Sequence, residues 1–333
     1  ICTGIAVVII PIVCLYLLQC LLVPKYASDI KEGAMIKEYY NSEKNHDVLI
    51  LGDCEVYENI STVTMWENYG ISSYIRGSAE QLIWQSYYLL EDTLKYEKPQ
   101  VVILNVLAMT ESDAKNEAYN RMTLDGMKLS KYKIASIRES MTEEENMASY
   151  IFPLLRYHSR WSELSSEDFR YMWKTPSVTT NGYLMQKGVR PVKTIPKAAP
   201  LANYTFSSRN MEYLDKIYSL CKDNDINLVL MKAPSVYPHW YDEWDRQVSD
   251  YADEHGILYL NTIDEAENIG IDYTTDTFDY GQHLNVEGAE KLSLYLGEQL
   301  VKNFRLTDHR QDESYKNAWK TIVNKYYEEK QGD

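Results

Sequence analysis

Cysteine is scarce in the part of the chain where a disulfide framework would have to form. Three of the five cysteines, Cys2, Cys14 and Cys20, lie in an uncharged N-terminal stretch, which leaves Cys54 and Cys221 for the remaining residues. Two cysteines do not build the dense disulfide framework of small secreted domains. A disulfide-stapled fold is therefore excluded, and the cellular compartment stays open.

Histidine and positive charge are also in short supply. The six histidines form no His-x-x-x-His or Cys/His set at ligand spacing, so we expect no metal site and no cofactor. The formal net charge is −15, from 34 Lys and Arg against 49 Asp and Glu. Such a balance argues against a nucleic-acid partner and against nonspecific adhesion to anionic lipid.

Residues 1–23 contain no charged side chain. At about 1.5 Å per residue, a helix of that length crosses the ~30 Å hydrocarbon layer, which predicts a single-pass transmembrane anchor. The alternative is a cleaved signal peptide, whose apolar region would span only about 7 to 15 residues before an A-x-A-like site. Lys25, Lys31 and Lys37 follow the stretch, but acidic residues are interleaved with them, so charge does not fix the orientation.

Apolar runs alternate with helical stretches after residue 46. Buried strands are predicted at 47–51, 74–75, 101–104, 227–231 and 257–260, with helices at 82–96, 208–222, 240–255 and 286–304. This alternation implies an α/β fold with a doubly wound, flavodoxin-like parallel sheet.

The predicted domain boundaries follow from where strands and helices alternate and where this alternation stops. We expect a linker at 24–46, an α/β domain at 47–304 and a C-terminal helical tail at 305–333. The alternation is absent at about 107–204, where the chain is first helical and polar and then irregular. This change predicts an inserted, mostly helical cap.

Polar residues follow three of the predicted strands. Cys54 lies in Gly-Asp-Cys-Glu after the first strand, Gly77 in Arg-Gly-Ser after the second, and Asn105 directly after the third. Asp279 and His283 precede the helix at 286–304. Because doubly wound folds bind ligands at the carboxyl ends of their strands, these residues are candidates for one site.

This ordered set resembles the SGNH (GDSL) hydrolase superfamily, over about 47–105 and 227–300. The resemblance implies an SGNH-type fold with Cys54 at the nucleophile position and His283 as the base. Asp279 would orient the imidazole, while Gly77 and Asn105 would donate to the oxyanion together with the backbone amide of Cys54.

Within that superfamily the chain looks most like a membrane-anchored branch, which includes the D-alanyl transfer protein of teichoic acid assembly and exopolysaccharide acetylation proteins. This narrower similarity implies a bacterial protein of the cell membrane, single-pass, with its folded domain extracellular. It also implies a cell-envelope polymer as substrate. A membrane-embedded O-acyltransferase is a further candidate partner.

Two departures from the SGNH pattern leave alternatives open. The family uses serine where this chain has Cys54, and a thiol there is either activated as a thiolate by a helix terminus and imidazole, or suppressed by the charges of Asp53 and Glu55. A cysteine is also a common small core residue. The family's acid lies three residues before the histidine, whereas Asp279 lies four before and Asp276 seven before, so either is a candidate.

Arg156 and Arg160 are candidate substrate-binding residues in the predicted cap. Guanidinium groups next to aromatic side chains suit a carboxylate, phosphate or sugar, although such arginines are also common in plain ion pairs. The leading hypothesis is a membrane-anchored acyltransferase or esterase acting on acyl groups of a cell-envelope polysaccharide or teichoic acid. The alternatives are a non-catalytic accessory protein and a carbohydrate-binding module built on the cap.

Overall fold

The core of the protein is a five-stranded parallel β-sheet. The structure is a computed structural model that describes residues 2–195 and 197–332, with the backbone alone for residues 2–8. The strands are β1 (Val48–Gly52), β2 (Ser73–Gly77), β3 (Val101–Asn105), β4 (Asn227–Lys232) and β5 (Leu258–Asn261). Their order is β2-β1-β3-β4-β5, and every neighbouring pair is parallel, which confirms the predicted parallel sheet.

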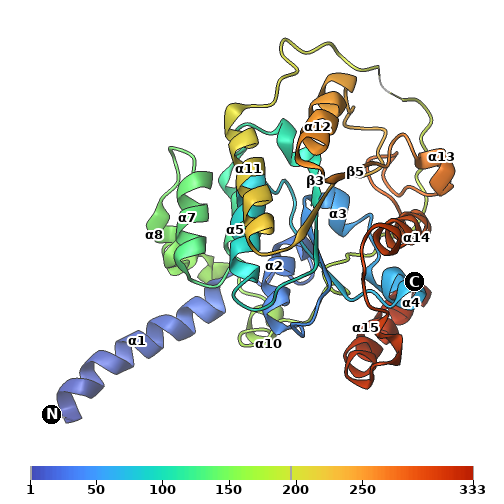
Figure 1. Ribbon diagram of the computed structural model, residues 1–333. Helices are drawn as coiled ribbons and strands as arrows, with labels where there is room; N and C mark the ends of the chain where they lie inside the picture. The colour runs from blue at the N-terminus through green and yellow to red at the C-terminus, as the bar shows by residue number, and fades with distance from the viewer. Residues whose placement is uncertain (1, 196, 333) are drawn as a thin grey trace.

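Helices cover both faces of this sheet (Figure 1). One face packs against α4 (Thr62–Tyr69), α14 (Val286–Asn303) and α15 (Glu313–Gln331), and the other against α5 (Ile83–Thr93), α11 (Ser208–Asp223) and α12 (Asp242–His255). Successive strand residues point to opposite faces, so Val48 and Ile50 join the first core and Leu49 and Leu51 the second. Strands buried on both sides need the continuous apolar runs seen in the sequence.

Short helical turns connect the sheet to its surroundings. Before β1 the chain forms η1 (Lys31–Ala34), α2 (Met35–Glu38) and η2 (Tyr39–Asn41). After strands come α3 (Cys54–Tyr57), η3 (Val106–Thr110) and α13 (Ala266–Ile269), and η5 (His309–Gln311) precedes α15. Asn285 caps α14 as predicted, because its side chain accepts a hydrogen bond from the Gly288 amide.

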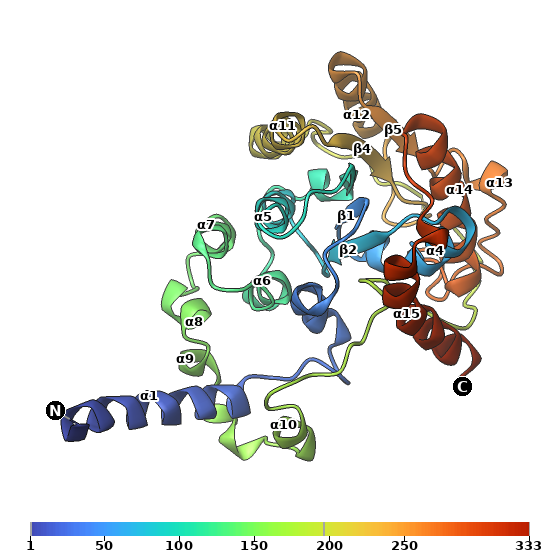
Figure 2. The same ribbon diagram turned by 60° about the horizontal axis from the view of Figure 1, so that its bottom comes forward.

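The segment after β3 is helical and then irregular. It contains α6 (Glu117–Leu124), α7 (Lys131–Ser140), α8 (Met147–Ile151), α9 (Leu154–Tyr157), η4 (His158–Ser162) and α10 (Ser166–Arg170). The helices α6, α7 and α8 gather on the α5 side of the sheet, whereas α9 and α10 lie next to α1 (Figure 2). The following stretch reaches α11 with only an isolated bridge between Thr180 and Tyr183 among its described residues.

The N-terminal helix α1 (Cys2–Leu22) extends away from the α/β core (Figures 1 and 2). The predicted anchor over 1–23 falls partly on residues 1–8, whose side chains lie outside the described part of the chain. Within the part that is described, no helix combines the length and apolar character that membrane crossing requires.

Candidate active site

Three of the predicted site residues lie at the carboxyl ends of adjacent strands. Gly52 at the end of β1 pairs in register with Gly77 at the end of β2, and Cys54 begins α3 two residues later. Asn105 ends β3 on the other side of β1. The fold therefore brings Cys54, Gly77 and Asn105 to one edge of the sheet, where doubly wound proteins place their ligand sites.

A tight turn holds His283 and Asp279 together. The Asp279 Oδ2 atom lies 2.6 Å from His283 Nδ1, and Asp279 Oδ1 accepts a hydrogen bond from the His283 amide at 2.8 Å. Tyr280 and Gly281 adopt left-handed backbone conformations, with φ of 68° and 91°, and a Thr277–Leu284 bridge closes the turn. Asp279 therefore contacts the ring from four residues upstream, whereas Asp276 pairs with Lys291 at 2.6 Å.

Glu58 is a second carboxylate beside the imidazole, and the sequence reasoning missed it. Its Oε2 atom lies 3.2 Å from His283 Nδ1, and its Oε1 accepts a hydrogen bond from Gln186 at 2.6 Å. Burial lowers the pKa of His283, but the Asp279 hydrogen bond and the charges of Glu58 and Asp279 outweigh it and raise this pKa to about 9. Burial raises the Glu58 pKa to about 7 against the opposing effect of His283. At neutral pH the imidazole is therefore protonated.

The surroundings of Cys54 keep its thiol protonated. Burial raises its pKa well above the ordinary value, and the charges of Asp53, Glu58 and Glu55 add to the effect. The helix that Cys54 begins is a single turn, so its dipole offers little to a thiolate. Of the two alternatives for this thiol, the geometry favours the one in which nearby carboxylates oppose its ionisation to a thiolate. Between the described side chains of Cys54 and His283 there is no hydrogen bond.

Asn105 is tied into the hydrogen bonds beneath the site. Its Nδ2 donates to Asp53 Oδ1 at 3.2 Å and to Glu55 Oε2 at 3.0 Å, and its Oδ1 accepts from the Ala233 amide at 3.2 Å. An amide nitrogen has two hydrogens, so both are engaged in this arrangement. Its oxyanion role remains a prediction, and it would require one of these bonds to be released.

A buried ion pair supports the loop that carries Cys54. Lys232, at the end of β4, places its Nζ 2.7 Å from Glu55 Oε1 and also donates to Ser235 Oγ at 3.1 Å. Both charged side chains are at most 1% exposed. Burial and the charge of Glu55 raise the pKa of neighbouring Asp53 to about 7. The lysine followed a predicted strand, but sequence alone did not pair it with Glu55.

A single methyl group at Gly77 would crowd the site. A Cβ atom there would lie 3.1 Å from the Gly52 carbonyl oxygen and 3.1 Å from Val56 Cγ2. The absence of a side chain therefore lets β2 end close against the Cys54 loop. The predicted donor role of the Gly77 amide remains a prediction.

Comparisons with known proteins give similarity to solved structures only. No family model and no curated protein matches the chain. A Bacteroides fragilis protein described as an acylhydrolase covers 85% of this chain and 97% of its own, with 11% identity and a TM-score of 0.38. A GDSL-like lipase from Bacteroides thetaiotaomicron covers 81% of this chain and 98% of its own, with 10% identity and a TM-score of 0.39. At such identities the site has to be judged by its own geometry.

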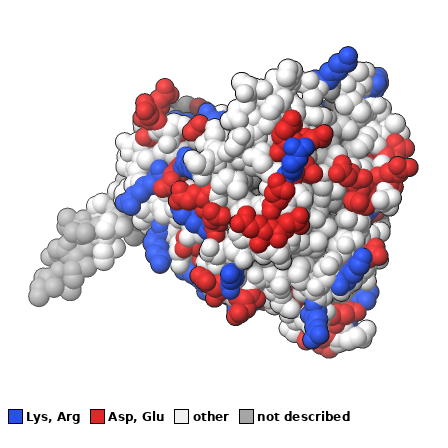
Figure 3. Space-filling view, turned by 45° about the horizontal axis from the view of Figure 1, so that its top comes forward, with Lys and Arg blue, Asp and Glu red and all other residues white. Residues whose placement is uncertain are grey.

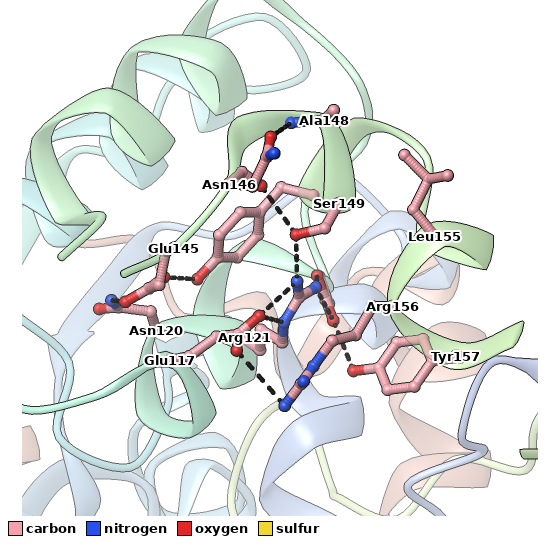
Figure 4. A network of polar contacts seen from close by, with 12 residues as sticks. Glu117, Asn120, Arg121, Glu145, Asn146, Ala148, Ser149, Leu155, Arg156 and Tyr157 are labelled. Atoms are coloured by element: carbon pink, nitrogen blue, oxygen red, sulfur yellow. Dashed lines mark hydrogen bonds and ion pairs between the residues drawn. The ribbon is translucent and has the colours of Figure 1, made fainter. Parts of the chain in front are cut away.

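The two predicted binding arginines lie in a different part of the structure. Arg156 on α9 pairs with Glu117 on α6 at 3.3 Å, beside the buried Arg121 (Figure 4). Arg160 in η4 donates to both carboxylate oxygens of Asp168 and to the Leu22 carbonyl at 2.5 Å. The structure thus joins Arg156 to α6 and Arg160 to Asp168 and the end of α1, and among the described side chains no hydrogen bond or ion pair links either arginine to Cys54 or His283. Their substrate-binding role remains a prediction.

Acidic side chains dominate one face of the molecule. In the view from the upper side of Figure 1, Asp and Glu form a band across the middle of the surface, with Lys and Arg scattered around it (Figure 3). This distribution agrees with the formal net charge of −15. A polyanion approaching this face meets electrostatic repulsion.

Proposed function

We propose that the protein is an SGNH-type acyl-transfer enzyme with Cys54 as nucleophile, His283 as base and Asp279 as the residue that orients the base. The observation that carries the proposal is the 2.6 Å contact between Asp279 and His283, in a fold that also places Cys54 at the carboxyl edge of the sheet. A carboxylate on Nδ1 fixes the tautomer and leaves Nε2 to exchange a proton.

The reaction follows from these roles. Cys54 Sγ attacks the carbonyl carbon of an ester, its proton passes to His283 Nε2, and the backbone amides of Cys54 and Gly77 stabilise the oxyanion. The alcohol leaves with the proton from His283, and a thioester remains. An acceptor hydroxyl then attacks the thioester, gives its proton to His283, and the thiol is restored. Water as acceptor makes the same reaction an ester hydrolysis.

The charges around the site set the pH at which this chemistry runs. His283 must lose its proton to act as base, and its pKa is about 9. The pKa of the thiol lies well above its ordinary value, so the reaction depends on proton removal by the imidazole during attack. We therefore expect rates that rise with pH up to about 9.

The proposed setting is the outer face of a bacterial cell membrane, with α1 as the anchor. Its described side chains from Ile9 to Leu18 are apolar, and most are about half exposed. The acidic face favours a neutral envelope polysaccharide over the polyanionic teichoic acid as substrate. A membrane-embedded O-acyltransferase would supply the acyl group.

The test is genetic complementation with chemical analysis of the envelope. Deleting the gene should remove acyl groups from an envelope polysaccharide, and a Cys54→Ala protein should fail to restore them. Cys221→Ala is the matched control, because this second cysteine is buried in α11 within the apolar core, and it should restore them. Full restoration by Cys54→Ala would remove the catalytic role.

A second candidate is a non-catalytic accessory protein that docks on a membrane-embedded acyltransferase. Two observations favour it: the carboxylates that suppress the Cys54 thiol, and the engagement of both Asn105 amide hydrogens. It predicts co-purification with the multi-span partner and unchanged acylation with Cys54→Ala or His283→Ala.

A further inference from the structure

Five large apolar side chains are exposed within one short stretch of the cap. Phe152, Leu155, Trp161, Phe169 and Trp173 are between 58% and 73% exposed. Single exposed apolar residues are ordinary, but a group of this size on consecutive elements marks an interaction surface. We call this set the apolar collar.

The apolar collar lies against the N-terminal helix. Its residues belong to the elements α8, α9, η4 and α10 or come within three residues after one of them, and α9, η4 and α10 contact α1. Figure 2 shows α9 and α10 beside the C-terminal half of this helix. The ring of Trp173 packs on Tyr16 of α1, with centroids 6.5 Å apart. Trp173 therefore joins the collar to the exposed apolar side chains of α1.

We propose that the apolar collar lies in the interfacial layer of the lipid bilayer, so that the cap is seated on the membrane beside α1. The inference extends the proposed anchoring by α1 and is independent of the chemistry at Cys54.

The depth of the collar fits this position. Tyr16 precedes Leu22, the last residue of α1, by six positions, which is about 9 Å along a helix. If Leu22 lies at the level of the headgroups, Trp173, which packs on Tyr16, lies about 9 Å deeper in the bilayer. Apolar faces of interfacial segments sit about 5–10 Å into the boundary between headgroups and acyl chains.

Cations mark the headgroup level at the same end of α1. Lys25 Nζ donates to the carbonyls of Cys20 at 2.6 Å and Val23 at 2.7 Å, and Arg160 donates to that of Leu22. Across 152–174 the basic residues outnumber the acidic ones, in a chain with a formal net charge of −15: Arg156, Arg160, Arg170 and Lys174 against Glu163, Glu167 and Asp168. Arg156 and Arg160 are paired with Glu117 and Asp168, so Arg170 and Lys174, which form no ion pair among the described residues, are the cations that suit phosphate groups of lipids.

The residue types in the collar are those found at membrane interfaces. Tryptophan concentrates at membrane interfaces because its ring is apolar while its N–H group remains near water. Trp161 and Trp173 are the most exposed large side chains of the collar, at 73% and 66%.

Fluorescence quenching by brominated lipid tests the position of the collar in the full-length chain. Of the seven tryptophans, Trp66, Trp84, Trp240 and Trp319 are less than 9% exposed and do not meet lipid. The chain would be reconstituted into phosphatidylcholine and phosphatidylglycerol vesicles with bromine placed high or low on the acyl chains. We expect a loss of emission that is larger with bromine high on the chain. The double variant Trp161→Phe/Trp173→Phe keeps the apolar surface and should show no such loss.

Flotation of the vesicles separates failure of the collar from failure of the anchor. A chain that floats with vesicles but shows no bromine-dependent loss of emission overturns the membrane position of the collar and leaves the anchor standing. A loss that persists in the double variant also overturns it. A chain that does not float overturns the anchoring and the collar together, and leaves the acyl chemistry to its own test.

Discussion

Replacing Asp279 by asparagine should lower the pKa of His283 by more than one pH unit. The present rise from 6.5 to about 9 corresponds to roughly 3 kcal/mol of preference for the protonated ring. Among the interactions that raise it, the Asp279 hydrogen bond is the largest. Hydrogen bonds to charged groups contribute about 1.5–3 kcal/mol, so the pKa in Asp279→Asn should fall to about 7 to 8.

The assay is an NMR titration of the imidazole nitrogens in the full-length chain, with His283 assigned by its absence in a His283→Gln protein. Asp276→Asn is the matched control, because Asp276 binds Lys291 and the Asp272 amide and makes no contact with the ring. Its His283 pKa should stay near 9. A wild-type value near 6.5, or an equal value in wild type and Asp279→Asn, would refute the reasoning.

Three further predictions concern stability and the arginines. The folded protein holds protons on Asp53, Glu58 and His283 more tightly than the unfolded chain does, because all three pKa values are raised. The free energy of unfolding therefore decreases as pH rises through about 7, where the two carboxyl groups ionise, and then through about 9, where the imidazole loses its proton. Melting temperatures should fall between pH 5 and pH 9.5. Glu58→Gln should flatten this slope near pH 7, and an unchanged slope would count against the assignment. Removing one partner of the buried pair, as in Glu55→Gln or Lys232→Met, should cost ~3–5 kcal/mol in urea unfolding, and the double variant should recover part of that loss; strictly additive losses would show no coupling. Arg160→Ala should lower the melting temperature without changing affinity for polysaccharide fragments, whereas lost affinity at an unchanged melting temperature would support the predicted binding role.

The strands and long helices were predictable because each carries a local signal. Val101–Asn105 is an apolar run after a proline-containing turn, and the structure forms β3 over those residues. Asn285 signalled the start of α14 through the capping preference of its side chain. Both signals lie within a few residues of the element they specify, so no knowledge of the tertiary structure was needed.

The details of the site depend on contacts that sequence does not pair. Lys232 and Glu55 are 177 positions apart, and only the parallel sheet order brings them together. The choice of Asp279 over Asp276 depends on the left-handed conformation of Tyr280, which a non-glycine residue rarely adopts. Glu58 lies four residues after Cys54, a helical spacing that offered a signal, but its contact with His283 requires the distant turn at 277–284.

The central claim is that His283 activates Cys54, and labelling of the full-length chain with a thiol-directed acyl probe tests it most directly. Labelling would be followed from pH 6 to pH 10 in detergent micelles, with the modified residue identified by mass spectrometry. Cys54→Ser shows the background from other thiols, and His283→Gln removes the base. The account predicts labelling at Cys54 that rises with pH up to about 9 and is lost in His283→Gln. Labelling at pH 9 and above that is no faster than that of a free thiol, or that is equal in wild type and His283→Gln, would contradict it.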